Sequence, residues 1–522
     1  MEASDDGQFA VLAIDLGTGG PKAAVVDAAG RTLGYGVATT PISHSADGGA
    51  EQDPEDWWRA IVAAARDALA AQAAGTPRPG AVAVTAQWVT TVPIDSRGAA
   101  VGHAISWMDT RGAPFARRAC GPGPRVAGYN AGKLVRWLRI TGGAPSLDGR
   151  DPVGQILFLR HERPDVYAAA DYFVEPGDYL TARMTGKVVT AAETATACWG
   201  TDTRNIAAIS YHDGALAMSG LDPGKLAPIV PTGAAAGELL AGPAAELGLE
   251  PGIPVLASTP DITSAAVGSG AVGDREAHLY AGTSGWLACH LPQRRADALH
   301  QVASLPSSLP GRYLIACEQQ CVGATLDHLR DRLLAAPQTP YPELMAEAQA
   351  AGIGSGGVQF TPWLNGERSP LDDSRLRGAY SNLSLTSDRG ALVRATLEGV
   401  AFNMRWLQRY TERLARSRHD SIAFIGGGAM SELWSQIFAD VLGREIRQIA
   451  EPRQANVRGA ALLALISLGR ITAGQVPGLV GVERTFTPDP VAVRQYDALF
   501  KDFQAYHKAT KKWHARRNAP EA

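Results

Sequence analysis

Ala13–Gly20, AIDLGTGG, is the stretch that decides the fold, because an apolar run there ends in a carboxylate and a glycine-rich turn. The apolar residues 9–15 predict a strand, and residues 22–27 and 31–38 predict two more strands beyond the turn. The same order of residue types returns in the second half of the chain at His278–Gly285, HLYAGTSG. Two such turns, each after a strand, predict two similar domains.

The residues between the two turns alternate helix and strand patterns. Asp53 is placed to cap a helix that begins at Pro54 and continues through the apolar-rich residues 57–73. Residues 81–86 then predict a buried strand. Near the other end of the chain, residues 421–442 predict a strand, a glycine turn and a helix, an arrangement that receives a phosphate or nucleotide. The pattern is typical of an α/β fold with helices packed on mixed sheets.

Length and composition limit the classes of function. At 522 residues the chain is longer than one core usually grows, so we expect domains over 1–256 and 257–475 and a helical extension over 476–522. The 45% hydrophobic and 19% charged residues exclude a disordered chain, and no apolar run is long enough to span a bilayer. The net charge of −3 and the acidic N-terminus favour a cytoplasmic protein that binds neither nucleic acid nor membrane.

Two smaller features have plain interpretations. Cys317 and Cys321 are four residues apart, but no second pair or histidine cluster completes a zinc site, so buried reduced thiols are favoured. A basic cluster near the C-terminus favours the solvated face of a last helix over a phosphate-binding stripe. The cluster is Lys501, Lys508, Lys511, Lys512, Arg516 and Arg517.

The two glycine-rich turns fit phosphoryl transfer, which depends on positioning and charge stabilisation. Gly17–Gly20 and Gly282–Gly285 can each wrap a phosphate, because glycine permits the positive φ angles that turn successive N–H groups inward. Each turn alone is more often only a turn, and the pair in matching contexts favours the functional reading. Neither turn is a Walker A loop, since no Gly-Lys-Ser/Thr follows the glycines.

Two carboxylates stand beside these turns. Asp15 ends an apolar strand, where a charge is costly to bury unless it is paired or bound to a cation, so it is a candidate Mg²⁺ anchor. Asp261 lies at the end of a second apolar strand, which begins near Val255, and at the predicted start of a helix. Catalysis and simple helix capping are both open for Asp261.

In this order the segments resemble the FGGY carbohydrate kinases, and among them the xylulokinase branch, over nearly the whole chain. Several of the segments are short, and their occurrence in register carries the resemblance. They are Asp15–Gly20, Glu51–Pro54, Trp107–Arg111, Gly177–Leu180, Gly282–Gly285, Gly366–Pro370 and Gly426–Ser431.

The resemblance implies two ribonuclease-H-like domains of the actin, Hsp70 and sugar-kinase superfamily, closing over a central cleft that holds ATP and Mg²⁺. Asp261 falls where the family keeps its general base, Asp15 falls on its metal-associated aspartate, and both are expected near the metal. The other residues expected to bind the nucleotide form two groups, one in the phosphate loops and one near adenine and ribose. These are Gly17, Thr18, Gly19, Gly282, Thr283 and Ser284 for the phosphates, and Gly427, Gly428, Ala429 and Asn456 for the nucleoside.

On the sugar side the resemblance has departures. The family's Gln-Met-His-Gly stretch is replaced by Gln87-Trp88-Val89-Thr90. This makes D-xylulose itself doubtful, since the lost His removes a hydrogen-bonding group and Trp88 could instead stack on a sugar face or narrow the pocket. Gly19 replaces a hydroxyl residue in the first turn, and a solvent-facing strand lysine is favoured for Lys22. The residues assigned to the sugar are Gln87, Trp88, Val89, Trp107, Asp109 and Asp178.

Structural alternatives stand beside some of these assignments. Trp107 and Asp109 fit a packed aromatic and a turn carboxylate equally well, and capping is open for Asp178. Arg111 is expected to order its loop through a charge pair, and Glu367 to fix the cleft wall. The leading hypothesis is ATP-dependent phosphorylation of a small sugar or polyol, such as a ketose related to xylulose. The alternative is a non-catalytic sugar or nucleotide sensor, and the family's frequent dimers also admit a homodimer.

Overall fold

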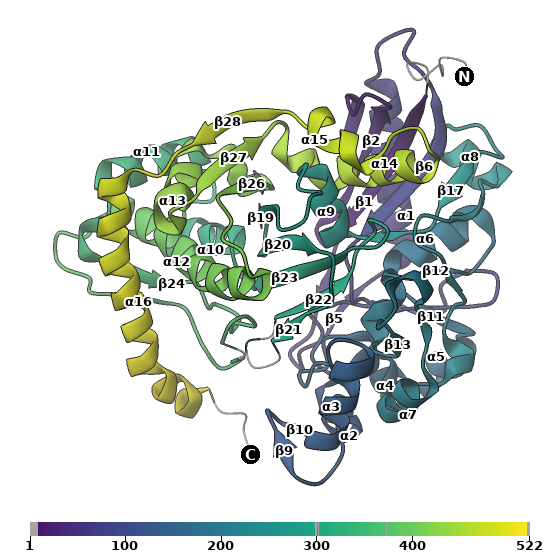
Figure 1. Ribbon diagram of the computed structural model, residues 1–522, viewed down its shortest axis with the longest axis horizontal. Coiled ribbons are helices and arrows are strands. Elements are labelled where there is room, and N and C mark those ends of the chain that lie inside the picture. The colour runs from purple at the N-terminus through teal and green to yellow at the C-terminus, as the bar shows by residue number, and fades with distance from the viewer. Residues whose placement is uncertain (1–8, 298–299, 301, 372, 519–522) are drawn as a thin grey trace.

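The computed structural model describes residues 9–297, 300, 302–371 and 373–518. Its first sheet follows the order β16-β17-β6-β1-β2-β3, with β18 also paired to β6 (Figure 1). The first three strands form an antiparallel meander, β6 runs parallel to β1, and β17 runs parallel to β6. The bounds are β1 Ala10–Gly17, β2 Gly20–Asp27, β3 Thr32–Val37, β6 Pro79–Ala86, β16 Ala235–Glu238, β17 Pro254–Leu256 and β18 Thr259–Pro260.

The second sheet repeats this topology in the order β21-β22-β23-β20-β19-β26-β27-β28. Strands β19, β20 and β23 form the antiparallel meander, β26 runs parallel to β19, and β27 runs parallel to β26. The shared strand order confirms the expected pair of ribonuclease-H-like domains. The bounds are β19 Ala277–Ala281, β20 Gly285–Leu291, β21 Ala296–Asp297, β22 Val302–Pro306, β23 Tyr313–Gln319, β26 Ser421–Ile425, β27 Glu445–Ile449 and β28 Val482–Phe486.

Helices cover both faces of each sheet, and two of them lie between the sheets (Figure 1). Along β1, Leu12 and Ile14 pack with α1, whereas Val11 and Ala13 pack in the cluster that contains α9 and α14. The same cluster includes Trp286 and other residues of the second sheet. Helices α9 and α14 therefore pack against both halves of the molecule, each built around one sheet and called a lobe below. The side chains alternate because successive residues of a strand point to opposite faces.

Several local predictions are confirmed. Helix α1 is Pro54–Ala70, with Asp53 as its N-cap, accepting from the backbone N–H of Glu55. Helix α13 is Glu432–Leu442, as predicted, and follows β26. The five cysteines are all buried and free. Within the expected C-terminal extension, β28 is a strand of the second sheet rather than helix.

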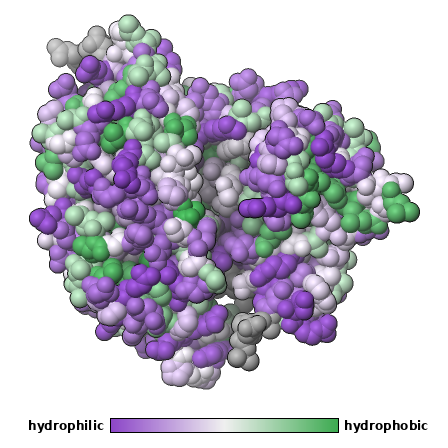
Figure 2. All heavy atoms as spheres, turned by 180° about the vertical axis from the view of Figure 1, so that it is seen from behind, coloured by the Kyte–Doolittle hydropathy of each residue, from purple (hydrophilic) through white to green (hydrophobic). Residues whose placement is uncertain are grey.

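The remaining elements complete the two lobes, and Figure 2 shows a hollow between them on the opposite face of the molecule. Within the described residues, none of the helices combines the length and apolar character needed to cross a membrane. The helices not yet bounded are α2 Ala113–Ala119, α3 Ala131–Ile140, α4 Pro152–Glu162, α5 Pro164–Ala169, α6 Pro176–Thr185, α7 Asp213–Ser219, α8 Ala241–Leu247, α9 Asp261–Gly268, α10 Gly323–His328, α11 Tyr341–Ala351, α12 Arg389–Ala415, α14 Ala455–Ser467, α15 Val476–Leu479 and α16 Pro490–Arg517. The short strands are β4 Ser43–His44, β5 Ala50–Gln52, β7 Val92–Ile94, β8 Ala104–Ile105, β9 Arg125–Val126, β10 Tyr129–Asn130, β11 Tyr172–Val174, β12 Thr190–Ala191, β13 Thr201–Asp202, β14 Ser210–Tyr211, β15 Ile229–Val230, β24 Gln359–Thr361 and β25 Ala379–Ser381.

Candidate active site

The two glycine-rich turns occupy equivalent places in the two sheets. Gly17 pairs with Gly20 across the β1–β2 turn, and Ala281 pairs with Gly285 across the β19–β20 turn. A side chain at Gly20 is excluded, because its φ is +133° and a Cβ there would overlap the backbone of Ala38 and Thr39, just after β3. Both hairpins therefore present short loops of backbone, as a phosphate cradle requires.

The second turn is braced by the start of α10. The N–H of Val322 donates to the carbonyl of Thr283 at 2.9 Å, and the N–H of Gly323 donates to the carbonyl of Gly282 at 2.7 Å. A Cβ at Gly282 would overlap the hydroxyl of Tyr280, which makes glycine necessary there. These contacts fix the turn against two neighbouring elements, while the tip of the first turn at Gly19 faces open space.

Asp15 continues the alternation of Val11 and Ala13 along β1, and therefore points toward the side of the sheet where α9 begins. Its side chain is 1% exposed, and its Oδ2 accepts from Lys22 Nζ at 3.0 Å. The Asp15 charge holds the pKa of Lys22 above its ordinary value. The prediction of a solvent-facing Lys22 is wrong, because the buried carboxylate attracts the ammonium from the next strand.

Asp261 is the first residue of α9, and its Oδ1 accepts from the N–H of Ile262 at 2.8 Å. Pro260 occupies the N-cap position, so Asp261 is not the helix cap. Burial, together with the charges of Asp15 and Glu318, raises the pKa of Asp261 to about 7. Asp15 and Thr259 both lie opposite Thr85 of β6, so Asp15 and Asp261 stand at the same end of the first sheet.

The hydroxyl of Thr18 is tied to the sugar side of the site. It donates to Gln87 Oε1 at 2.8 Å and accepts from Trp107 Nε1 at 2.9 Å. Gln52 Nε2 donates to the carbonyl of Thr18 at 3.1 Å and to the carbonyl of Pro41 at 3.2 Å. Gln87 Nε2 donates to Gln52 Oε1 at 2.9 Å. Gln87 and Trp107 are therefore brought together directly beneath the first turn.

The loop that replaces the family's Met-His pair has an unusual backbone. Val89 has φ of +55°, a left-handed conformation that is rare for a β-branched residue. Trp88 Nε1 donates to the carbonyl of Thr194 at 3.3 Å, and Gln155 Nε2 donates to the carbonyl of Val89 at 2.9 Å. Trp88 and Val89 are held by the protein from both sides, and each is partly exposed.

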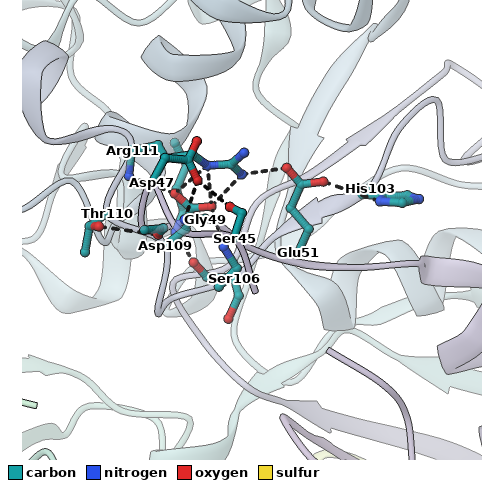
Figure 3. Close-up of polar contacts among 12 residues, drawn as sticks. Ser45, Asp47, Gly49, Glu51, His103, Ser106, Asp109, Thr110 and Arg111 are labelled. Atoms are coloured by element: carbon teal, nitrogen blue, oxygen red, sulfur yellow. Dashed lines mark hydrogen bonds and ion pairs between the residues drawn. The ribbon is translucent and has the colours of Figure 1, made fainter. Parts of the chain in front are cut away.

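Asp109 is fully engaged by the protein itself. Its carboxylate accepts from the N–H of Ala50 at 2.9 Å and from the guanidinium of Arg111, with the closest nitrogen at 2.6 Å. Arg111 also bonds Glu51 at 2.5 Å, and His103 pairs with the other oxygen of Glu51 (Figure 3). The charge pair predicted for Arg111 is confirmed, and Asp109, which is buried, acts as the turn carboxylate that orders this loop.

Asp178 lies in the first turn of α6, where its Oδ1 accepts from Ser258 Oγ at 2.6 Å. Burial raises its pKa to about 7. The residue at the N-cap of α6 is Glu175, so Asp178 does not cap the helix. Sequence reasoning missed Glu175, although an acidic residue between an apolar strand and Pro176 was a signal for a buried carboxylate. Asp178 and Glu175 line one small cavity together with Thr190, Thr194, Cys198 and Tyr211.

The nucleotide-side residues come from two elements. Gly427, Gly428 and Ala429 form a short 3-10 turn between β26 and α13, and a Cβ at Gly428 would overlap Ala281 of the second phosphate turn. Gly427 faces open space, whereas Ala429 is buried. Asn456 lies in the first turn of α14 and is 6% exposed. The glycine turn therefore packs against the strand that leads into the second phosphate turn.

Glu367 is buried and joins three segments of the second lobe by hydrogen bonds. It accepts from the N–H groups of Gln320 and Arg368 at 3.1 and 3.0 Å and from Asn403 Nδ2 at 2.9 Å. Burial raises the pKa of Glu367 to about 8. Arg368 in turn bonds Glu318, the carboxylate whose charge reaches Asp261.

The donor set fits a magnesium ion that is shared with phosphates. Asp15 Oδ1 is buried without a hydrogen-bond partner, and an orphaned carboxylate oxygen is a ligand that Mg²⁺ prefers. Among the described residues there is no group of three or more His, Cys, Asp or Glu side chains arranged to hold a metal. This is compatible with Mg²⁺, which is usually bound through one or two carboxylates, waters and substrate phosphates rather than by a cage of protein ligands.

Comparisons with known proteins agree with this architecture. Residues 10–268 match the model of the N-terminal domain of the FGGY family of carbohydrate kinases, and residues 277–468 match the model of its C-terminal domain. The xylulose kinase of Streptomyces coelicolor is 30% identical over 458 residues, which cover 87% of this chain and 87% of that protein.

Two solved structures have the same fold over nearly the whole chain. A xylulose kinase from Lactobacillus acidophilus has a TM-score of 0.84 at 20% identity and covers 97% of this chain and 99% of its own. A gluconate kinase from the same organism has a TM-score of 0.83 at 21% identity and covers 96% of this chain and 98% of its own. With two family models that together span most of the sequence, this chain belongs to the FGGY family of carbohydrate kinases.

Proposed function

We propose that this carbohydrate kinase transfers the γ-phosphoryl of Mg-ATP to a hydroxyl of a small neutral ketose or polyol, with Asp261 as the general base. The observation that carries the proposal is the sheet register: Asp15 on β1 and Thr259, two residues before Asp261, both lie opposite Thr85 of β6. A carboxylate with a pKa near 7 accepts a proton efficiently at neutral pH. Asp261 takes the proton of the attacking hydroxyl, and Asp15 stays paired with Lys22.

The two turns supply the donor side of the reaction. The backbone N–H groups of Gly17–Gly19, Thr283 and Ser284 hold the phosphate oxygens, where their dipoles oppose the charge that develops in the transition state. The N–H of Gly282 donates to the carbonyl of Ser284 and fixes the second turn. Asp15 and Asp261 would hold Mg²⁺, which would supply positive charge against the phosphates. Gly427, Gly428, Ala429 and Asn456 bind the nucleoside in this proposal. The Thr18 hydroxyl, in contrast, is proposed to position Gln87 and Trp107.

A neutral acceptor is favoured over a sugar acid. The side chains around the acceptor side include the buried carboxylates Asp178 and Glu175, and the nearby cation Arg111 is neutralised by Asp109 and Glu51. Burial raises the pKa of both carboxyl groups, so they are suited to hydrogen-bond hydroxyl groups, whereas the carboxylate of a sugar acid would find no counter-charge in them. Gln87, Trp88, Val89, Trp107 and Asp178 form the proposed acceptor wall, and xylulose is one member of the substrate class.

The substitution Asp261→Asn tests the proposed base. Turnover should fall by roughly 10²–10⁴-fold, because the amide cannot accept the proton, while ATP binding is retained. The measurement is ADP release with a panel of D-xylulose, D-ribulose, xylitol and erythritol, with ATP affinity measured by calorimetry. Asp53→Asn, at the N-cap of α1, is a matched control that should keep full turnover.

Two outcomes would contradict the proposal. Undiminished turnover in Asp261→Asn would remove Asp261 as the base. Binding of a sugar by the wild-type protein with no ADP release from any acceptor in the panel would instead favour a non-catalytic sensor.

A further inference from the structure

Glu175 is placed against the acceptor loop by a two-stranded ribbon. Strands β7 and β11 pair antiparallel, with Val174, the last residue of β11, opposite Val92, the first residue of β7. Glu175 follows Val174 and therefore lies beside the residues that precede Val92. These preceding residues are the loop 88–91. Glu175 is 7% exposed, and Pro176 begins α6 directly after it. The sheet register therefore forces a buried carboxylate against the backbone of this loop.

The carboxylate is bonded to the strained part of the loop. The N–H of Thr90 donates to Glu175 Oε2 at 3.1 Å, and the N–H of Val89 donates to the same carboxylate. Val89 is the residue with φ of +55°. A β-branched residue keeps a left-handed conformation only where its surroundings impose it. Two N–H groups turned toward the buried carboxyl group of Glu175 supply that constraint, because a buried N–H that loses its acceptor costs free energy.

The same loop connects Glu175 to the aromatic side chains of the acceptor wall. Thr90 Oγ1 accepts from the N–H of Trp107 at 3.1 Å, and Trp107 Nε1 donates to Thr18 Oγ1. Trp88 directly precedes the strained residue, so its ring direction follows from the loop conformation. A shift of the loop would thus move both tryptophans together. Neither Glu175 nor Thr90 touches the turns proposed to hold the phosphates.

We propose that Glu175 is a positioning residue that determines acceptor specificity, by holding Val89 and Thr90 in the conformation that presents Trp88 and Trp107 to the sugar. This inference rests on the proposed kinase function of the same cleft. The hydrogen bonds described for the Glu175 side chain go to the loop of the acceptor wall, and none of them reaches the two glycine-rich turns. Loss of these bonds should therefore change the affinity for the acceptor without changing the affinity for ATP.

The test compares two substitutions that differ in how many hydrogen-bond acceptor oxygens they remove from residue 175. Glu175→Gln keeps one acceptor oxygen without the charge, and Glu175→Met removes both oxygens at similar volume. The KM of the best acceptor from the panel of D-xylulose, D-ribulose, xylitol and erythritol should rise roughly 10-fold in the first and more in the second. The KM for ATP should stay within about 2-fold and kcat within about 3-fold. Glu162→Gln, an exposed carboxylate at the end of α4, is the charge-matched control.

A second variant pair separates positioning from general damage. Glycine adopts a left-handed φ without the cost that valine pays. Val89→Gly combined with Glu175→Gln should therefore recover roughly 3-fold or more of the lost acceptor affinity. A carboxylate that only stabilised the lobe would show no such recovery, and thermal unfolding of each variant checks that it is folded.

Three results would overturn the proposal: acceptor KM unchanged in Glu175→Met, a parallel rise of the KM for ATP, or no recovery in the double variant. If Glu175→Met does not fold, Glu175→Gln and the double variant still decide the question. A wild-type protein that phosphorylates no acceptor in the panel would instead refute the kinase function, so the two failures are distinguishable.

Discussion

Asp15 and Asp261 show how one residue type acquires two characters from its surroundings. Lys22 compensates the charge of Asp15 through a direct ion pair. Asp261 has no such partner, and burial together with the charge of Asp15 raises its pKa to about 7. Two carboxylates with different environments in one site are a recurrent arrangement for acid–base chemistry, because their protonation states are driven apart.

The pH dependence of the reaction should follow from Asp261. The base acts in its deprotonated form, so kcat/KM for the acceptor should fall by about tenfold per pH unit below an apparent pKa near 7 and level off above it. Lys22→Met should move this limb to higher pH, because the Lys22 cation lowers the pKa of Asp261. A pH–rate profile between pH 5.5 and 9, with D-xylulose as a first acceptor, provides the measurement. A profile that is flat or that falls with rising pH would contradict the assignment.

At the scale of elements, the crossing of α9 and α14 joins the two halves of the site. Asp261 begins α9 and Asn456 lies in the first turn of α14, so the crossing links the proposed base to the nucleotide side. At the crossing the backbones touch, since a Cβ at Gly268 would overlap the carbonyl of Ala455 and a Cβ at Gly459 would overlap that of Ser264. The buried guanidinium of Arg458 on α14 adds a hydrogen bond across this contact, donating to the carbonyl of Gly268 on α9 at 2.9 Å.

The substitution Gly459→Ala should destabilise the protein by about 2 kcal/mol or more, because the added methyl must push two helices apart in a packed core. Urea unfolding followed by circular dichroism measures the loss. Gly478→Ala in α15 is the matched control, since a Cβ there meets no atom within 4 Å and alanine is the better helix former. Equal stability of the two variants would show that the helices separate without cost.

At the scale of the whole molecule, Arg294 ties the second lobe to the first. Its guanidinium, beyond the end of β20, donates to the carbonyls of Arg139 and Ile140 at 2.6 and 2.9 Å and to Thr203 Oγ1 at 2.8 Å. Tyr313 of β23 adds a bond from its hydroxyl to the carbonyl of Thr203 at 3.0 Å. These contacts bridge the lobes, and we propose that they favour a closed form of the cleft in which both substrates bind.

Removing this bridge should weaken the binding of both substrates. Arg294→Ala should raise the KM for the acceptor and for ATP by roughly 3- to 10-fold each, because the form that binds both substrates becomes less populated. Steady-state kinetics with each substrate varied in turn gives the two values. Arg204→Ala, whose guanidinium pairs with Asp202 inside the first lobe, should leave both unchanged. A change in only one KM would assign Arg294 to one substrate rather than to closure.

Much of the local structure could be predicted from the sequence. The strands around Gly17–Gly20, the Asp53 cap and the helix 432–442 follow from apolar periodicity and capping, which involve residues close together in the chain. The partners of Lys22, Thr18 and Asp109 could not be predicted in this way. Each of these side chains bonds a partner that the sheet register or a neighbouring loop brings near.

Residue type and short spacing were enough to specify two repeated strand–turn units, their flanking helices and the pair of aspartates. Tertiary packing was needed to place Asp15 and Asp261 at the same end of the first sheet, to bond Thr18 to Gln87 and Trp107, and to set Glu175 against the N–H of Thr90. The physical reason is that side-chain direction, burial and electrostatic coupling depend on how distant strands and helices pack, which no local pattern encodes.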